Sequence, residues 1–97
     1  MPALEVRALE GIELDYEKIN QICPKCQRKM EVDYPFRIMG WRFISLGTCS
    51  KCNSRILDEL IVKKSLCGEE IYKEVATVID EYDYLRYENK LKNKIYN

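Results

Sequence analysis

The sequence predicts an α+β protein: a small three-stranded antiparallel sheet with a short strand before it and a long helix after it. Three observations lead to this class. Apolar and polar residues alternate near the N-terminus, strand-like runs fill the middle, and apolar residues recur at helical spacing beyond Gly68. At 97 residues the chain has the length of one domain. We expect an extension over residues 1–21, a β-rich region over 22–66 and an amphipathic helix over 67–97.

The N-terminal extension is expected to hold one strand and one turn. Alternation over residues 3–14 predicts the strand, because its apolar side chains fall on one side. Asp15 can then cap a brief helical turn over residues 16–19. The apolar side of the strand consists of Leu4, Val6 and Ala8.

The middle of the chain is expected to form the sheet. Strand-like runs cover residues 29–38, 40–46 and 55–64, with breaks at Gly40 and Gly47. Bulky and β-favouring residues in these runs could cover one face of a small sheet. They are Trp41, Phe43, Ile44, Ile56, Leu60 and Val62.

A helical pattern is expected to follow Gly68. No glycine or proline interrupts residues 69–97. Acidic residues dominate the start of this segment and lysines its end, as the helix dipole favours. The apolar residues recur every three or four positions, which predicts one buried stripe. This stripe comprises Ile71, Val75, Val78, Ile79, Tyr82 and Leu85.

Composition excludes several classes of protein. Histidine is absent, which removes the commonest general base and the Ser-His and Cys-His nucleophile pairs, so we expect no enzyme and no small-molecule substrate. No apolar run is long enough to cross a bilayer, and the acidic start lacks the basic and apolar regions of a signal peptide. We therefore expect an intracellular protein without membrane contact.

Four of the five cysteines form two Cys-x-x-Cys units separated by 22 residues. In a reducing compartment such pairs hold metal more often than they form disulfides. Two tight turns can present four thiolates to one ion and close its coordination, which is typical of a structural site. The sequence thus predicts one Zn²⁺ per chain, bound by Cys23, Cys26, Cys49 and Cys52.

Residues 22–64 resemble the zinc-ribbon superfamily. Cys-Pro-Lys-Cys at 23–26 looks like a first zinc knuckle and Cys-Ser-Lys-Cys at 49–52 like a second. The resemblance implies a three-stranded antiparallel sheet beside one zinc, and a role in transcription or another regulatory process. Gln27 and Asn53 depart from the pattern, because many ribbons place glycine after the second cysteine of each knuckle.

Other interpretations of the cysteines stay open. Disulfides or free thiols are one, a redox-active Cys-x-x-Cys is a second, and a four-sulfur iron site is a third. Cys67, before the expected helix, is read as a small half-buried residue, with an exchangeable fifth ligand or a reactive thiol as the alternative.

The charge distribution suggests nucleic acid as the first candidate partner. Residues 23–68 carry nine basic and four acidic side chains, whereas the segments on either side are acidic. Basic residues interleaved with aromatic ones can neutralise phosphates and stack bases. A sequence pI of about 6.3 is low for a dedicated binder. The candidate surface comprises Lys25, Arg28, Lys29, Arg37, Trp41, Arg42, Lys51 and Arg55.

A protein partner is the second candidate. The C-terminal region is rich in tyrosine, a residue type enriched at interfaces. Its acidic first half and basic second half could pair antiparallel with a second copy, which predicts a homodimer. The candidate interaction helix presents Tyr72, Tyr82, Tyr84 and Tyr87.

Overall fold

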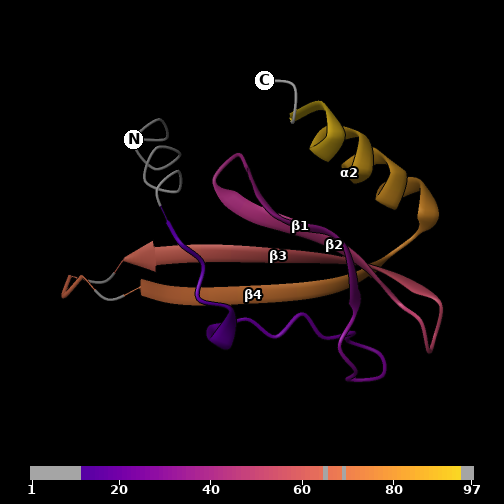
Figure 1. Ribbon diagram of the computed structural model, residues 1–97, viewed down its shortest axis with the longest axis horizontal. Coiled ribbons are helices and arrows are strands. Elements are labelled where there is room, and N and C mark those ends of the chain that lie inside the picture. The colour runs from indigo at the N-terminus through magenta and orange to yellow at the C-terminus, as the bar shows by residue number, and fades with distance from the viewer. Residues whose placement is uncertain (1–11, 65, 69, 95–97) are drawn as a thin grey trace.

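The computed structural model describes residues 12–64, 66–68 and 70–94, and shows a four-stranded antiparallel sheet followed by one helix (Figure 1). Each strand lies beside the next in the chain. The strands are β1 (Glu31–Met39), β2 (Arg42–Cys49), β3 (Ser54–Lys64) and β4 (Glu70–Ile79), and the helix is α2 (Glu81–Lys94). The predicted α+β class is confirmed, but the sheet has four strands where we expected three.

The additional strand, β4, replaces the first third of the expected C-terminal helix. It pairs with β3 without interruption, from Arg55 opposite Ile79 to Lys64 opposite Glu70. The chain reverses before it through a turn that includes Gly68, whose φ of 85° suits glycine. Helix α2 starts only at Glu81, where Asp80 caps it by accepting a hydrogen bond from the amide of Asp83 at 2.8 Å. The prediction of a helix over 67–97 was therefore wrong for residues 70–79.

The N-terminal turn forms where we expected it. A single turn of 3₁₀ helix, η1 (Tyr16–Lys18), is capped by Asp15, whose carboxylate accepts from the amide of Glu17 at 3.1 Å. The strand expected over residues 3–14 falls mostly outside the described residues, and residues 12–14 belong to no strand.

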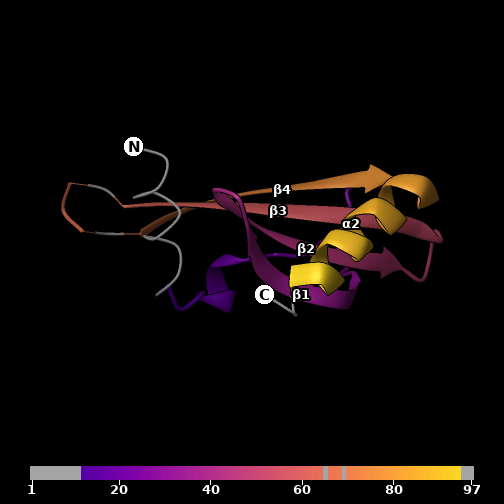
Figure 2. The same cartoon turned by 90° about the horizontal axis from the view of Figure 1, so that it is seen from above.

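Two layers cover the sheet on opposite faces. Helix α2 lies over one face, and residues 16–30 run along the other (Figures 1 and 2). Both faces of β2 are consequently buried from Phe43 to Gly47. The glycine break expected at residue 47 is wrong, because Gly47 lies inside β2, whereas Gly40 does form the turn between β1 and β2.

Alternate residues of β2 contribute to different cores. On the α2 side, Ile44 and Leu46 pack with the helix residues Tyr84 and Leu91. On the other side, Phe43 packs with Ile19 and Leu60 beneath the N-terminal segment. The six residues that we expected on one face are thus divided between two, and Trp41 is 56% exposed in the β1–β2 turn.

A third buried cluster lies near the cysteines. It combines Cys23, Met30, Cys49 and Ile56 at the end of the sheet where β2 passes into β3. None of the described helices is long and apolar enough to span a membrane.

Candidate metal centre

The four cysteines of the two Cys-x-x-Cys units converge on one point. Their sulfur atoms all lie within 4.8 Å of one another. The Sγ atoms of Cys23 and Cys52 are 3.6 Å apart, and those of Cys26 and Cys49 are 3.2 Å apart. Four sulfurs bound tetrahedrally at about 2.3 Å from one ion would be separated by roughly 3.8 Å. The cluster therefore has the size and donor set to hold a metal ion.

Hydrogen bonds shape the first cysteine turn. We call residues 22–29 the first knuckle, since an isolated β-bridge between Ile22 and Lys29 closes this segment. Within it, the amide of Cys23 donates to the carbonyl of Arg28 at 2.8 Å, and the amide of Gln27 donates to the carbonyl of Cys23 at 2.9 Å.

The second knuckle, residues 49–53, makes a matching turn between β2 and β3. The residue after the second cysteine has a left-handed backbone in both knuckles, with φ of 62° at Gln27 and 53° at Asn53. These positions adopt the conformation that glycine provides in many ribbons, so the departure from the family pattern does not disrupt the turns.

The knuckle backbone also stabilises negative charge on sulfur. Hydrogen bonding to the backbone of Cys52 is the largest cause that lowers the pKa of Cys49, to about 6. Sharing a proton with Cys49 raises the pKa of Cys26 to about 11. One thiolate of this pair therefore forms readily, and a cation that replaces the shared proton would deprotonate the second.

A close contact fixes the first knuckle against the sheet. Met30 follows this knuckle and is buried against β2 at Gly47. A Cβ atom added at Gly47 would lie 2.7 Å from the carbonyl oxygen of Glu31 and 2.8 Å from the sulfur of Met30. Glycine is thus required for this approach, a role that the sequence pattern alone did not reveal.

A carboxyl pair, Asp58 buried and Glu74 half-buried, lies on the face of the sheet that Met30 also covers. Asp58 is fully buried on β3, and no described residue donates a hydrogen bond to either of its oxygens. Its neighbour is Glu74 on β4, whose oxygens accept from the amides of Asn20 at 2.7 Å and Gln21 at 2.9 Å. Glu74 thus connects the sheet to the segment that leads into the first knuckle.

Burial sets the charge of this pair. Burial, followed by the contact with Glu74, raises the pKa of Asp58 to about 9. Burial alone would raise the pKa of Glu74, but the neighbouring Asp58 carboxyl group and the hydrogen bonds from the amides of Asn20 and Gln21 lower it overall. Asp58 is therefore protonated at neutral pH beside the Glu74 carboxylate. An acidic residue inside the otherwise apolar run at 56–60 was the available sequence signal for this pair.

The structure divides the candidate nucleic-acid residues among separate locations. Lys25, Arg28 and Lys29 are exposed on the first knuckle, and Lys51 is exposed on the second. Arg37, Trp41 and Arg42 belong to the opposite end of the β1–β2 hairpin, where Arg42 pairs with Glu59 at 2.6 Å. Arg55 lies over the Tyr84 ring, 4.6 Å from its centroid. Only the four knuckle cations surround the metal centre.

The candidate interaction tyrosines are likewise dispersed. Tyr72 belongs to β4, where its hydroxyl accepts from the amide of Asp15 at 2.9 Å. Tyr84 is buried, and Tyr87 packs against the same core. Tyr82, which is 70% exposed, is the member of the set that α2 presents to solvent.

Cys67 does not join the metal centre. It is exposed in the turn that follows β3, whereas Cys52 precedes that strand, so the length of β3 separates them. The half-buried position expected for Cys67, at the start of a helix, is wrong.

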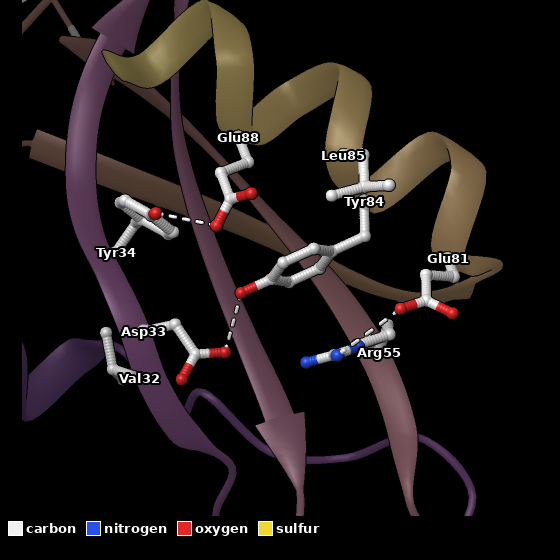
Figure 3. Close-up of a pocket in the computed structure, with 8 residues that line it drawn as sticks. All are labelled: Val32, Asp33, Tyr34, Arg55, Glu81, Tyr84, Leu85 and Glu88. Carbon is white, nitrogen blue, oxygen red and sulfur yellow. Dashed lines mark hydrogen bonds and ion pairs between the residues drawn. The ribbon is translucent and has the colours of Figure 1, made fainter.

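A surface pocket of about 600 Å³ lies between β1 and α2, and its polar groups contact one another (Figure 3). The hydroxyl of Tyr34 donates to Glu88 at 2.6 Å, and that of Tyr84 donates to Asp33 at 2.7 Å. The contact with Glu88 raises the pKa of Tyr34, whereas burial, followed by the contact with Asp33, raises the pKa of Tyr84. These two hydrogen bonds therefore join α2 to β1. The acidic side chains that line the pocket would repel phosphates.

Comparison with protein-family models finds no match, and comparisons with curated proteins and with solved structures find none either. The interpretation of this site consequently depends on its own geometry and chemistry.

Proposed function

We propose that this chain is a non-enzymatic zinc-ribbon module that binds nucleic acid through the exposed cations of its two knuckles. The observation that supports the zinc assignment is the group of four thiol sulfurs within 4.8 Å of one another. Four sulfur ligands suit Zn²⁺ in a closed structural site, and iron is the competing ion for the same donors. Bound zinc would supply folding free energy and fix the two knuckles relative to each other.

The charge of the knuckles supports the choice of partner. Residues 22–29 and 49–53 contain no acidic side chain and carry four cations. Zinc with four thiolates has a net charge of minus two, so the metal-bound surface keeps a positive charge of about two. The cations are exposed, whereas Arg42 and Arg55 already have acidic or aromatic partners. A small basic surface beside a rigid site can contact the phosphate backbone, and the zinc-ribbon resemblance favours a transcription-related or other intracellular regulatory role.

A binding experiment with two matched variants tests this proposal. The knuckle variant combines Lys25→Glu, Arg28→Glu and Lys51→Glu, and the control combines Arg37→Glu, Lys63→Glu and Lys73→Glu, also exposed cations. Fluorescence anisotropy with single- and double-stranded DNA and RNA across a salt series should show salt-dependent binding by the native chain. The knuckle variant should lose it and the control should retain part of it. Equal losses in both variants, or no binding by the native chain, would contradict the proposal.

A protein partner is the second candidate function. Tyr82 and Leu85 of α2 are 70% and 48% exposed, and Leu85 also lines the pocket between β1 and α2. Exposed aromatic and aliphatic side chains of this kind are common at interfaces. This alternative predicts that Tyr82→Ser with Leu85→Ser abolishes partner binding without changing the helix content measured by circular dichroism.

A further inference from the structure

The two edges of the sheet differ in how they are protected. The β1 edge carries Pro35, and its register with β2 shifts twice, between Val32 and Tyr34 and between Tyr34 and Arg37. Proline, bulges and irregular register are the devices by which natural sheets prevent edge pairing.

The β4 edge has none of these devices. Its 10 residues contain no proline or glycine, and its register with β3 is unbroken. Among the described residues, only β3 hydrogen-bonds to the β4 backbone, so within this part of the chain the outward N–H and C=O groups of alternate β4 residues have no partner. Figure 2 shows β4 along one side of the sheet, with α2 over the strands nearer the other side. A long, regular strand edge of this kind is a template for another strand.

Apolar side chains accompany this open edge. Ile71 and Val75 are 54% and 45% exposed and lie on the same face of β4, which is the face on which α2 packs farther across the sheet. A strand added beside β4 would cover them as well as the free backbone groups.

We infer that the β4 edge binds the β4 edge of a second copy of this chain, forming a continuous eight-stranded antiparallel sheet. The interface is distinct from the helix pairing expected from the sequence, and it does not depend on nucleic-acid binding. A two-fold axis perpendicular to the sheet places each residue opposite a residue of the same face.

Charge and the matching of apolar residues together select the register of this pairing. An axis through Lys73 or Glu74 would place like charges directly opposite each other, which is destabilising. An axis through Val75 avoids this over residues 71–79. It places Val75 opposite its own counterpart, Ile71 opposite Ile79, and Lys73 opposite Thr77 of the second copy. This register matches the two exposed apolar residues with apolar partners across nearly the whole strand.

The test uses two valines of equal exposure. Val75→Lys would place two lysines opposite each other at the axis, whereas Val32→Lys makes the same change at a 44% exposed valine on the irregular β1 edge. Sedimentation velocity of the zinc-loaded chain over a concentration series should give a dimer for the native chain and for Val32→Lys. Val75→Lys should raise the dissociation constant by at least about tenfold. Mixing Val75→Lys with Val75→Glu should restore a dimer, because the charges at the axis then attract.

Several outcomes would overturn the inference. One is a native chain that sediments as a monomer up to about 0.5 mM, a concentration that detects even a weak complex. A second is an equal rise of the dissociation constant in Val75→Lys and Val32→Lys. A third is a mixture of Val75→Lys and Val75→Glu that stays monomeric while each variant keeps the native circular dichroism spectrum. Each of these results would mean that β4 is not the interface.

Discussion

Gln27 and Asn53 hold the same left-handed backbone conformation, each directly after the second cysteine of its knuckle. An asparagine tolerates this conformation better than a glutamine, because its short side chain can hydrogen-bond locally. The first knuckle therefore carries more backbone strain than the second.

Replacing Gln27 by glycine should relieve that strain. We expect Gln27→Gly to raise the free energy of unfolding of the zinc-loaded protein by about 0.5–1 kcal/mol, and Asn53→Gly to change it less. Chemical denaturation monitored by circular dichroism compares the two variants. A loss of stability in Gln27→Gly would show that the side chain itself, rather than the backbone conformation, matters at this position.

A methyl group at Gly47 should separate the first knuckle from the sheet. Because a Cβ atom there would lie within 2.9 Å of three atoms of Met30 and Glu31, Gly47→Ala requires a backbone shift. We expect it to lower the free energy of unfolding by about 1–3 kcal/mol and to weaken zinc affinity. Competition with a chromogenic zinc chelator measures the zinc affinity. Gly40→Ala is the control for zinc affinity, because a Cβ atom at Gly40 would contact no other atom. Equal zinc affinity in the native chain and in Gly47→Ala would contradict this account.

The buried carboxyl pair predicts an unusual pH dependence of stability. The pKa of Asp58 is about 9 in the folded chain and near 3.8 when unfolded, so the folded state binds one more proton between these values. Stability should therefore fall as the pH rises through this window, by up to about 1.4 kcal/mol per pH unit. The lowered pKa of Glu74 acts in the opposite sense, since its contribution is lost only as the pH falls through the acidic range.

Asp58→Asn isolates this effect. An asparagine amide stays uncharged at every pH, so the variant should lose most of the slope and be more stable than the native chain above about pH 7. Thermal unfolding of zinc-saturated protein between about pH 6 and pH 8.5 measures the slope within a range that keeps zinc bound. Identical slopes in the native chain and the variant would rule out a protonated Asp58.

Helix α2 should detach if its buried leucine is shortened. Leu91 is fully buried against β2, whereas Leu85 on the same helix is 48% exposed. We expect Leu91→Ala to lower the free energy of unfolding by about 2–5 kcal/mol and Leu85→Ala to lower it by less than about 1 kcal/mol. Hydrogen exchange of the α2 amides reports the detachment. Similar costs for the two variants would contradict the packing described here.

The sequence predicted the cysteine site better than it predicted the strand next to the helix. Two Cys-x-x-Cys units are most simply explained by one shared metal site, and the structure brings their four sulfurs together. Residues 70–79, in contrast, fit a helical pattern in the sequence, because Ile71, Val75 and Val78 recur at helical spacing. In the structure they form a strand in which exposure alternates from residue to residue. The abundance of β-branched residues in this segment was the local signal for a strand. Pairing along the whole of β3 then determined the outcome, and this long-range contact cannot be read from a single segment.

The candidate binding surface was predicted least well, for a related reason. Basic and aromatic residues adjacent in the sequence were grouped together, but β1 and β2 carry Arg37 and Arg42 away from the knuckles. A strand carries residues that are near each other in the sequence to opposite ends of the sheet, whereas the four-cysteine cluster brings together two knuckles that are far apart in the sequence. Composition alone contains neither piece of information.

The most direct test of this account is the metal content of the purified chain, measured by native mass spectrometry with Cys49→Ser and Cys67→Ser beside it. We predict one zinc per chain in the native protein and in Cys67→Ser, because Cys67 is exposed and outside the four-sulfur cluster. Cys49→Ser should lose the zinc and with it the cooperative thermal transition. A native chain without bound metal, or a Cys49→Ser variant that keeps both zinc and melting temperature, would contradict the assignment of a structural zinc site.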